Sequence, residues 1–165
     1  MKNKALLIPK NARIDWQILE HTLRQQFGVH AIVFDQNGER RTQEDISWAN
    51  SICAAVKTNP NGNEHVWSAT QRRMCCDARK KECCVREECP IGMVKMVVPI
   101  MSEDSFEGFV CVGGRPFVNI HRIYTNTLQR ILEISEEEIQ RHLIAVKPIN
   151  YYTIKDIMAY ITSYN

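Results

Sequence analysis

Two strand-like runs separated by a short polar turn are the feature that most restricts the fold of this chain. The residues from Val94 to Met101 are nearly all apolar, and a second apolar run extends from Phe106 to Val112. Ser102 to Ser105, between them, are typical of a turn. Because the connection is this short, the two runs are expected to pair as an antiparallel hairpin. We therefore expect a sheet built on this hairpin at the centre of the fold.

Helix patterns occur on both sides of the hairpin, together with one further strand. The strand is expected at residues 29–35, where Asn37-Gly38 signals a hairpin turn and a returning strand at 40–42. The expected helices cover residues 14–27, 45–57 and 119–133, a segment that begins at Ser135 with a capping box, and a segment from Thr153.

Two segments are interpreted as irregular. Asn59-Pro-Asn-Gly62 is expected to break the chain, and residues 68–88 are expected to form a short helix followed by a loop. The glycines of Gly113-Gly114-Arg115-Pro116 are expected to end the second strand of the hairpin. The complete pattern predicts an α+β fold in which a central antiparallel sheet is flanked by helices, with a helix at each end of the chain. Residues 1–165 are expected to form a single domain.

Charge and hydropathy exclude several partners. The 21 basic and 19 acidic residues leave a formal net charge of +2, too small to indicate direct nucleic-acid binding or an anionic membrane surface. No stretch approaches the roughly 20 apolar residues that a membrane-spanning helix requires. The apolar run from Ala5 to Ile8 is too short for a secretion signal. A cytoplasmic location without membrane contact is therefore expected.

Seven cysteines distinguish this composition, and five of them fall between Cys75 and Cys89. An odd number without a secretion signal argues against a disulfide framework. Clustered thiols in a reducing compartment are typical of metal ligands or redox groups, because a soft cation neutralises thiolates that otherwise repel one another. The cysteines are Cys53, Cys75, Cys76, Cys83, Cys84, Cys89 and Cys111.

An iron–sulfur cluster or a zinc ion is the cofactor that this pattern favours. The predicted ligands are Cys53, Cys76, Cys84 and Cys89, with Cys75 and Cys83 as alternatives. The pattern lacks Cys-x-x-Cys, so it is neither a zinc ribbon nor a bacterial ferredoxin motif. Redox-active or merely buried thiols are the alternatives, and Cys111, in the middle of a strand, is interpreted as a packing residue.

Other residue types give weaker indications. The sequence lacks a Ser-His-Asp arrangement, a P-loop and G-x-G-x-x-G, so an enzyme is not expected. His65 precedes the cysteine segment and could approach the site, although a structural or surface role is the simpler interpretation. Trp16, Trp48 and Trp67 either line a pocket or pack in the core.

The stretch Cys89-Pro-Ile-Gly-Met-Val-Lys-Met-Val-Val-Pro-Ile100 resembles a signature of PocR-type sensory domains. The second strand, Phe106-Glu-Gly-Phe-Val-Cys-Val-Gly-Gly114, continues that resemblance. Ile52-Cys53, Cys75-Cys76-Asp77 and the helix start at Ile134 to Glu138 also fit, so the similarity spans about residues 12–162.

The resemblance implies a PAS-like fold and a role as the input module of bacterial or archaeal signalling proteins. Members are thought to sense small molecules such as simple diols or other hydrocarbon derivatives. Two departures argue against a diol pocket here: Pro90 replaces the family's His, and Gly113-Gly114-Arg115 replaces Gly-Gln. The additional Cys83 and Cys84 instead favour a metal or cluster.

Three hypotheses follow for function. In the first, a cytoplasmic sensory domain holds a cysteine-ligated iron–sulfur or metal centre, and a change at that centre shifts the terminal helices. In the second, the same fold is metal-free and binds a small organic molecule such as a diol. In the third, a pair of thiols carries out redox chemistry. The expected partners are a small-molecule or redox signal and a signalling output domain or protein. The terminal helix either docks on the domain or pairs with a second copy in a homodimer.

Overall fold

The hairpin expected from the sequence forms the centre of the sheet. Strand β4 (Met93–Ser102) and strand β5 (Ser105–Pro116) pair antiparallel from end to end. Every residue of β4 is buried, because the strand has neighbours on both edges and helices over both faces. The structure is a computed structural model that describes residues 5–10, 12–43, 47–103, 105–117 and 122–164.

The remaining elements surround this hairpin. The other strands are β1 (Leu6–Ile8), β2 (His30–Asp35) and β3 (Val85–Glu88). The helices are α1 (Trp16–Phe27), α2 (Ser51–Thr58), α3 (Pro60–Gly62), the π-helix η1 (Asn63–Ser68), α4 (Ala69–Lys81), α5 (Arg122–Leu132), α6 (Glu136–Leu143) and α7 (Tyr151–Thr162).

The strand order is β1-β4-β5-β2, and β3 also pairs with β4. β3 runs antiparallel along the first half of β4, whereas β1 runs parallel to its end. Pro99, which has no N–H to donate, falls between the ends of these two partners. The expected α+β fold, a PAS-like central sheet flanked by helices with a helix near each chain end, is confirmed. The parallel β1 makes the sheet mixed.

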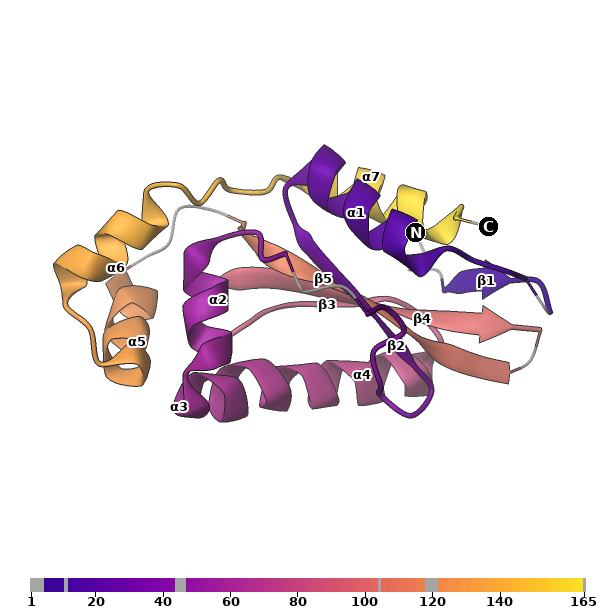
Figure 1. Ribbon diagram of the computed structural model, residues 1–165, viewed down its shortest axis with the longest axis horizontal. Coiled ribbons are helices and arrows are strands. Elements are labelled where there is room, and N and C mark those ends of the chain that lie inside the picture. Colours follow the sequence, from indigo (N-terminus) through magenta and orange to yellow (C-terminus); the bar gives the residue numbers. More distant parts are fainter. Residues whose placement is uncertain (1–4, 11, 44–46, 104, 118–121, 165) are drawn as a thin grey trace.

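Helices cover both faces of the sheet (Figure 1). α1 and α7 lie side by side over one face and pack on alternate residues of β4, such as Val94 and Met96. α4 runs along the opposite face, where Val97 and Cys111 meet Met74. α5 and α6 stand at one end of the sheet beside α2. The site described below lies on the α4 face.

The break expected at Asn59-Pro-Asn-Gly62 occurs at Asn59 alone. Asn59 is extended, and its side-chain oxygen accepts a hydrogen bond from the Gly62 N–H at 3.0 Å. Pro60 then begins a new helix, since its fixed φ suits a first helical position. The helical path continues through η1 into α4. The short helix expected from Ser68 therefore extends to Lys81, and residues expected to be a loop form β3.

Three further expectations are corrected. The helix expected at 45–57 begins at Ser51, because Asn50 caps it by accepting from the Cys53 N–H; residues 45–46 lie outside the described part. The returning strand at 40–42 is reduced to a single bridge between Phe34 and Arg40. β1 was not expected, because three residues are too few to show a strand periodicity.

The glycine pair does not end β5, which continues to Pro116. Val94 pairs with Arg115 and Lys95 pairs with Gly113, so Gly114 is an extra residue in the ladder. Its φ of 100° is a conformation that glycine adopts readily. Gly114 is therefore the bulged residue of a β-bulge, at the wall of the site.

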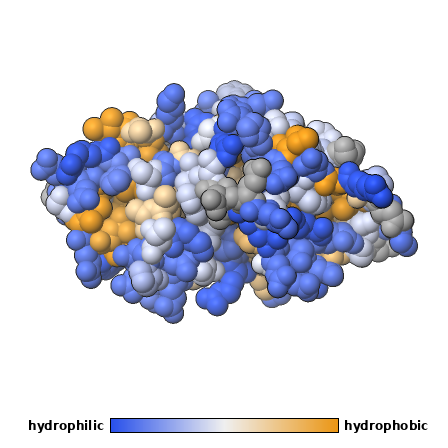
Figure 2. Space-filling model, in the orientation of Figure 1, coloured by the Kyte–Doolittle hydropathy of each residue, from blue (hydrophilic) through white to orange (hydrophobic). Residues whose placement is uncertain are grey.

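The face of the molecule seen in Figure 2 is mainly hydrophilic, with hydrophobic surface at the end formed by α5 and α6 and further hydrophobic patches toward the opposite end. Among the described residues, no helix combines the length and the apolar character that crossing a bilayer requires.

Candidate functional site

Three neighbouring strands place His30, Gly113 and Lys95 in one row. His30 of β2 and Lys95 of β4 both pair with Gly113 of β5, which lies between them. Gly113 has no side chain, and the imidazole and the lysine stem lie close over it: a Cβ atom placed there would be 3.1 Å from Nε2 of His30 and 3.4 Å from Cγ of Lys95. His30 and Lys95, together with the next residue Gly114, form the floor of a cavity on the α4 face of the sheet.

The cavity is narrow: the space between its atoms is about 330 Å³ when the part open to solvent is included, but only about 20 Å³ of it has room for the centre of a water molecule. Its floor comes from the strands, one wall from α2 and the other from η1, and the segment between β3 and β4 closes one end. Most of the lining is apolar, and the polar groups are few, as is typical of sites for small organic molecules. The lining residues are His30, Cys53, Val56, Val66, Trp67, Cys89, Ile91, Met93, Lys95 and Gly114.

Aromatic rings surround the polar end of this cavity. The ring centroids of His30, Trp48 and Trp67 lie between 5.0 and 5.7 Å from one another. Nζ of Lys95 lies 4.0 Å from the Trp67 centroid, which is cation–π distance. Trp67 belongs to η1, and π-helical turns of this kind occur frequently at functional sites.

Lys95 is a buried ammonium with few partners. Only 5% of the residue is exposed, and its Nζ donates to Oε1 of Gln71 at 3.0 Å. Among the described residues, Lys95 forms no ion pair with Asp or Glu. Burial lowers the pKa of Lys95, although the surrounding thiols oppose that shift. A lysine that is desolvated in this way is a strong indication of function.

His30 is a buried imidazole that stays neutral. Burial, and then the nearby Lys95 charge, lower the pKa of His30 to about 3. Its Nδ1 is buried without a hydrogen-bond partner among the described residues. A buried polar atom in this state is costly, so this nitrogen is available for a hydrogen bond to a bound molecule.

A family model described as the sensory domain found in PocR matches residues 14–164 of this chain. The chain belongs to the PocR sensory-domain family. This membership confirms the resemblance carried by the Cys89–Ile100 stretch and assigns the chain a signalling role, as an input module that senses a signal by binding a ligand. No curated protein and no solved structure matches the chain.

Within this PocR domain, two of the predicted ligand cysteines come together. Cys53 of α2 and Cys89, which follows β3, both line the cavity and belong to one apolar cluster. Burial, and then the neighbouring Cys89, raise the pKa of Cys53 to about 12. Burial also raises the pKa of Cys89. Both side chains are therefore neutral thiols at neutral pH.

The other two predicted ligands lie elsewhere. Cys84 is buried in the cluster on the α1–α7 face of the sheet, and Cys76 is exposed on α4. The alternative Cys83 follows the end of α4. Cys75, on α4, lies near enough to Lys95 to act on its charge, as Cys53 and Cys89 do, but it packs against a different apolar cluster. Within the part of the chain that the structure describes, no three His, Cys, Asp or Glu side chains gather so that they could hold a metal ion. The geometry therefore lends no support to the four-cysteine centre.

Sequence reasoning missed the two polar residues of the cavity. His30 opens an apolar strand, and Lys95 is the one charged residue in the otherwise apolar run of β4. A lone charge in a strand that is buried on both faces is the signal that could have revealed Lys95. His65, considered near the cysteine segment, is instead exposed.

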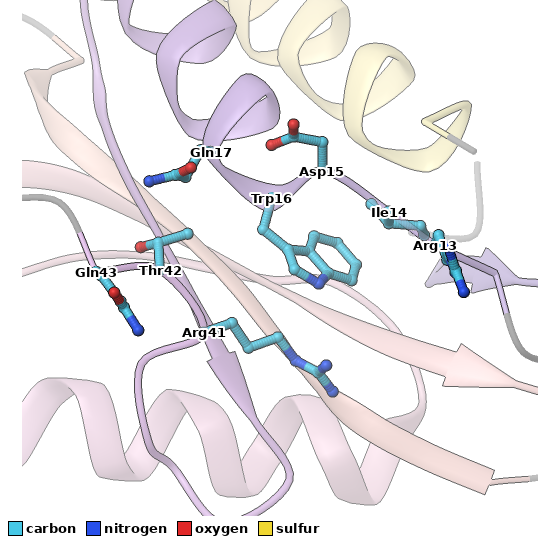
Figure 3. Close-up of a pocket in the computed structure, with 8 residues that line it drawn as sticks. All are labelled: Arg13, Ile14, Asp15, Trp16, Gln17, Arg41, Thr42 and Gln43. Atoms are coloured by element: carbon cyan, nitrogen blue, oxygen red, sulfur yellow. The ribbon is translucent and has the colours of Figure 1, made fainter.

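A second hollow lies on the surface beside the start of α1 (Figure 3). Trp16 and Arg41 project into the space between α1 and the segment after β2, and the guanidinium carbon lies 5.5 Å from the indole centroid. Two of its polar side chains already have hydrogen-bond partners: Arg41 donates to the Glu107 carbonyl at 2.6 Å, and Thr42 donates to the Glu20 carboxylate at 3.0 Å. This open hollow therefore offers less to a ligand than the cavity does.

Proposed function

We propose that this domain senses a small hydroxylated organic molecule, of the size and polarity of a short diol, in the cavity above Gly113. The observation that carries the proposal is the pairing of two unusual groups across one glycine. Lys95 presents a buried ammonium without a carboxylate partner among the described residues, and His30 presents an unpartnered Nδ1.

The chemistry of these groups selects a hydroxyl. Lys95 donates hydrogen bonds only, so it requires an acceptor oxygen. Nδ1 of a neutral imidazole donates or accepts according to its tautomer, and a hydroxyl satisfies either state. The carbon body of such a ligand would contact Val56, Ile91 and Met93. A molecule with two adjacent hydroxyls on a short chain fits both requirements.

A route from the cavity to the chain ends supports a role as an input module. The Gly114 carbonyl accepts from the Asn50 side chain at 2.5 Å, and Asn50 caps α2. The next residue, Arg115, donates to the carbonyl of Phe27 at the end of α1 and to that of Lys147 before α7. A ligand that moves the bulge would therefore act on both terminal helices, which pack together.

The test is calorimetric titration of the full chain, purified without oxygen, with ethane-1,2-diol, propane-1,2-diol and butane-2,3-diol. We expect saturable binding of at least one diol, and loss of that binding in Lys95→Met. Arg41→Gln, in the surface hollow, is the matched control and should bind as the wild type does. Absence of binding by every diol would refute the proposal.

The same preparation tests the metal alternative. An iron–sulfur or zinc centre would need Cys53, Cys76, Cys84 and Cys89 to converge, which they do not do in this structure. We therefore expect less than stoichiometric iron, sulfide and zinc, and no visible absorbance. A coloured sample with stoichiometric iron would favour the metal centre over the diol site.

A further inference from the structure

Two thiols meet at the interface between α4 and the sheet, next to the cavity but outside it. Cys75 of α4 and Cys111 of β5 lie close enough that each shifts the pKa of the other. The amide nitrogen of Gln71 binds both sulfur atoms, at 3.6 Å from Cys75 and 2.6 Å from Cys111. The sulfurs are therefore neighbours although 35 residues separate them in the sequence.

The surroundings make the two thiols chemically different. The neighbouring Cys111, and to a smaller extent Lys95 and Gln71, lower the pKa of Cys75 against the effect of burial. Burial raises the pKa of Cys111 well above its usual value. Cys75 is accordingly the thiol that ionises, and Cys111 remains protonated beside it.

The thiol that ionises more easily is also the one that solvent reaches more easily. Cys75 is partly exposed, whereas Cys111 is only 3% exposed. A small oxidant from solvent can reach the first sulfur and not the second. A reactive, accessible thiol with a second thiol in contact is the arrangement in which oxidation ends in a disulfide.

We propose that Cys75 and Cys111 form an oxidisable pair that responds to a small peroxide. The Cys75 thiolate attacks one peroxide oxygen, the O–O bond breaks, and hydroxide leaves; Cys75 becomes a sulfenic acid. The Cys111 sulfur then attacks the Cys75 sulfur, the S–O bond breaks, and the leaving hydroxide takes the Cys111 proton as water. In total, two thiols and one hydrogen peroxide give one disulfide and two waters.

Lys95 connects this pair to the cavity. Its ammonium is bonded to the same Gln71 side chain whose amide nitrogen binds both sulfurs. Formation of the disulfide consumes both thiols that the Gln71 amide contacts, so it would change the hydrogen bonding of the side chain that holds Lys95. The consequence for diol affinity rests on the proposed function, whereas formation of the disulfide does not.

The experiment exposes the reduced full chain to a small excess of hydrogen peroxide at pH 7.5, quenches it at intervals and maps its peptides by mass spectrometry without reduction. We expect a peptide pair linked through Cys75 and Cys111 as the main product. Cys76→Ser removes the exposed thiol one residue away and should leave the product unchanged, whereas Cys75→Ser should abolish it. Lys95→Met should slow its formation, because the positive charge of Lys95 favours the Cys75 thiolate.

Three outcomes would overturn the inference: no linked pair, a main disulfide through Cys76, or an undiminished rate in Lys95→Met. The peptide map of the oxidised wild-type chain tests the first two outcomes without any variant. A variant that folds poorly therefore does not affect these two tests. Diol titration of the reduced chain is scored separately. A linked pair without diol binding would refute the proposed function alone, and the converse would refute the thiol pair alone.

Discussion

His30 and Lys95 face each other across Gly113, and a Cβ atom added to that glycine would come within 3.1 Å of Nε2 of His30 and 3.4 Å of Cγ of Lys95. The second distance is an ordinary contact, and the first is only slightly too short. A methyl group therefore fits here only by occupying the space that the two polar side chains share. The cavity floor is consequently sensitive to substitutions that the fold itself tolerates.

Gly113→Ala tests this sensitivity. We expect diol affinity to fall by about tenfold or more, because the methyl group fills the floor between the two polar groups. The free energy of unfolding should change by less than about 1 kcal/mol, since alanine suits a strand better than glycine does and offsets the close contact. Calorimetric titration and urea denaturation measure the two effects.

Gly114→Ala is the matched contrast. There φ is 100°, and a Cβ atom would lie 2.5 Å from that of Ala49, so we expect a loss of about 1–3 kcal/mol in the free energy of unfolding. Equal stability losses in the two variants would contradict the distinction between the cavity floor and a strained bulge.

Lys95→Met should separate stability from binding. Methionine removes a buried charge while keeping most of the side-chain volume, so the free energy of unfolding should rise by about 1 kcal/mol. Diol binding should be lost at the same time, because no ammonium remains to donate to the ligand. Urea denaturation of wild type and variant at pH 7.5 measures the first effect. A large loss of stability would show instead that Lys95 serves the fold.

His30 predicts a specific pH dependence. Its pKa is about 3 in the folded chain and about 6.5 in the unfolded chain, so below pH 6.5 the unfolded chain binds a proton that the folded chain does not. Stability should therefore fall as the pH drops from 6.5 towards 3. Between pH 7 and pH 5 this group should account for about 2 kcal/mol. In His30→Gln that part of the slope should vanish, and identical slopes in urea denaturation would contradict the assignment.

The sheet and its flanking helices were predictable because they depend on local patterns. β4 and β5 show as apolar runs around a polar turn, and α1 ends at Gly28, whose positive φ fits the expected cap. The path after Asn59 was not predictable in the same way. Pro60 and Gly62 each indicate a break in the helix when they are considered alone. In the structure, Pro60 occupies the first turn of α3. Gly62 lies against the backbone of Val56, where a side chain would not fit.

The site was predicted only in part, since it depends on which strands become neighbours. The sequence predicted Cys53 and Cys89 as two ligands of one metal centre, and these two residues line the same cavity. Clustering along the chain suggested that Cys76 and Cys84 would join them, but Cys76 is exposed on α4, and Cys84, just before β3, packs in the cluster on the opposite face. His30 and Lys95 are 65 positions apart, and only the pairing of both with Gly113 brings them together.

Arg115 gives the last prediction, because its guanidinium bonds to segments that are distant in sequence. Nη1 donates to the Phe27 carbonyl at 2.6 Å, Nε donates to the Lys147 carbonyl at 3.1 Å, and Nη2 donates to the carbonyl of Pro148. These carbonyls lie at the end of α1 and just before α7, so Arg115 links the bulge to both terminal helices.

In Arg115→Met the aliphatic stem is retained and the three donors are lost, so the linker before α7 should loosen while the cavity stays intact. We expect faster hydrogen exchange in α7 and at the end of α1, with a loss of about 1–3 kcal/mol in local stability. Diol affinity should change by less than about threefold, roughly 0.6 kcal/mol, because no ligand contact is removed. Hydrogen exchange followed by mass spectrometry, with and without diol, measures both effects.

In the wild type the diol should slow exchange in α7, and in Arg115→Met that response should disappear. A variant that binds diol and still protects α7 would show that the signal reaches the terminal helices by another route.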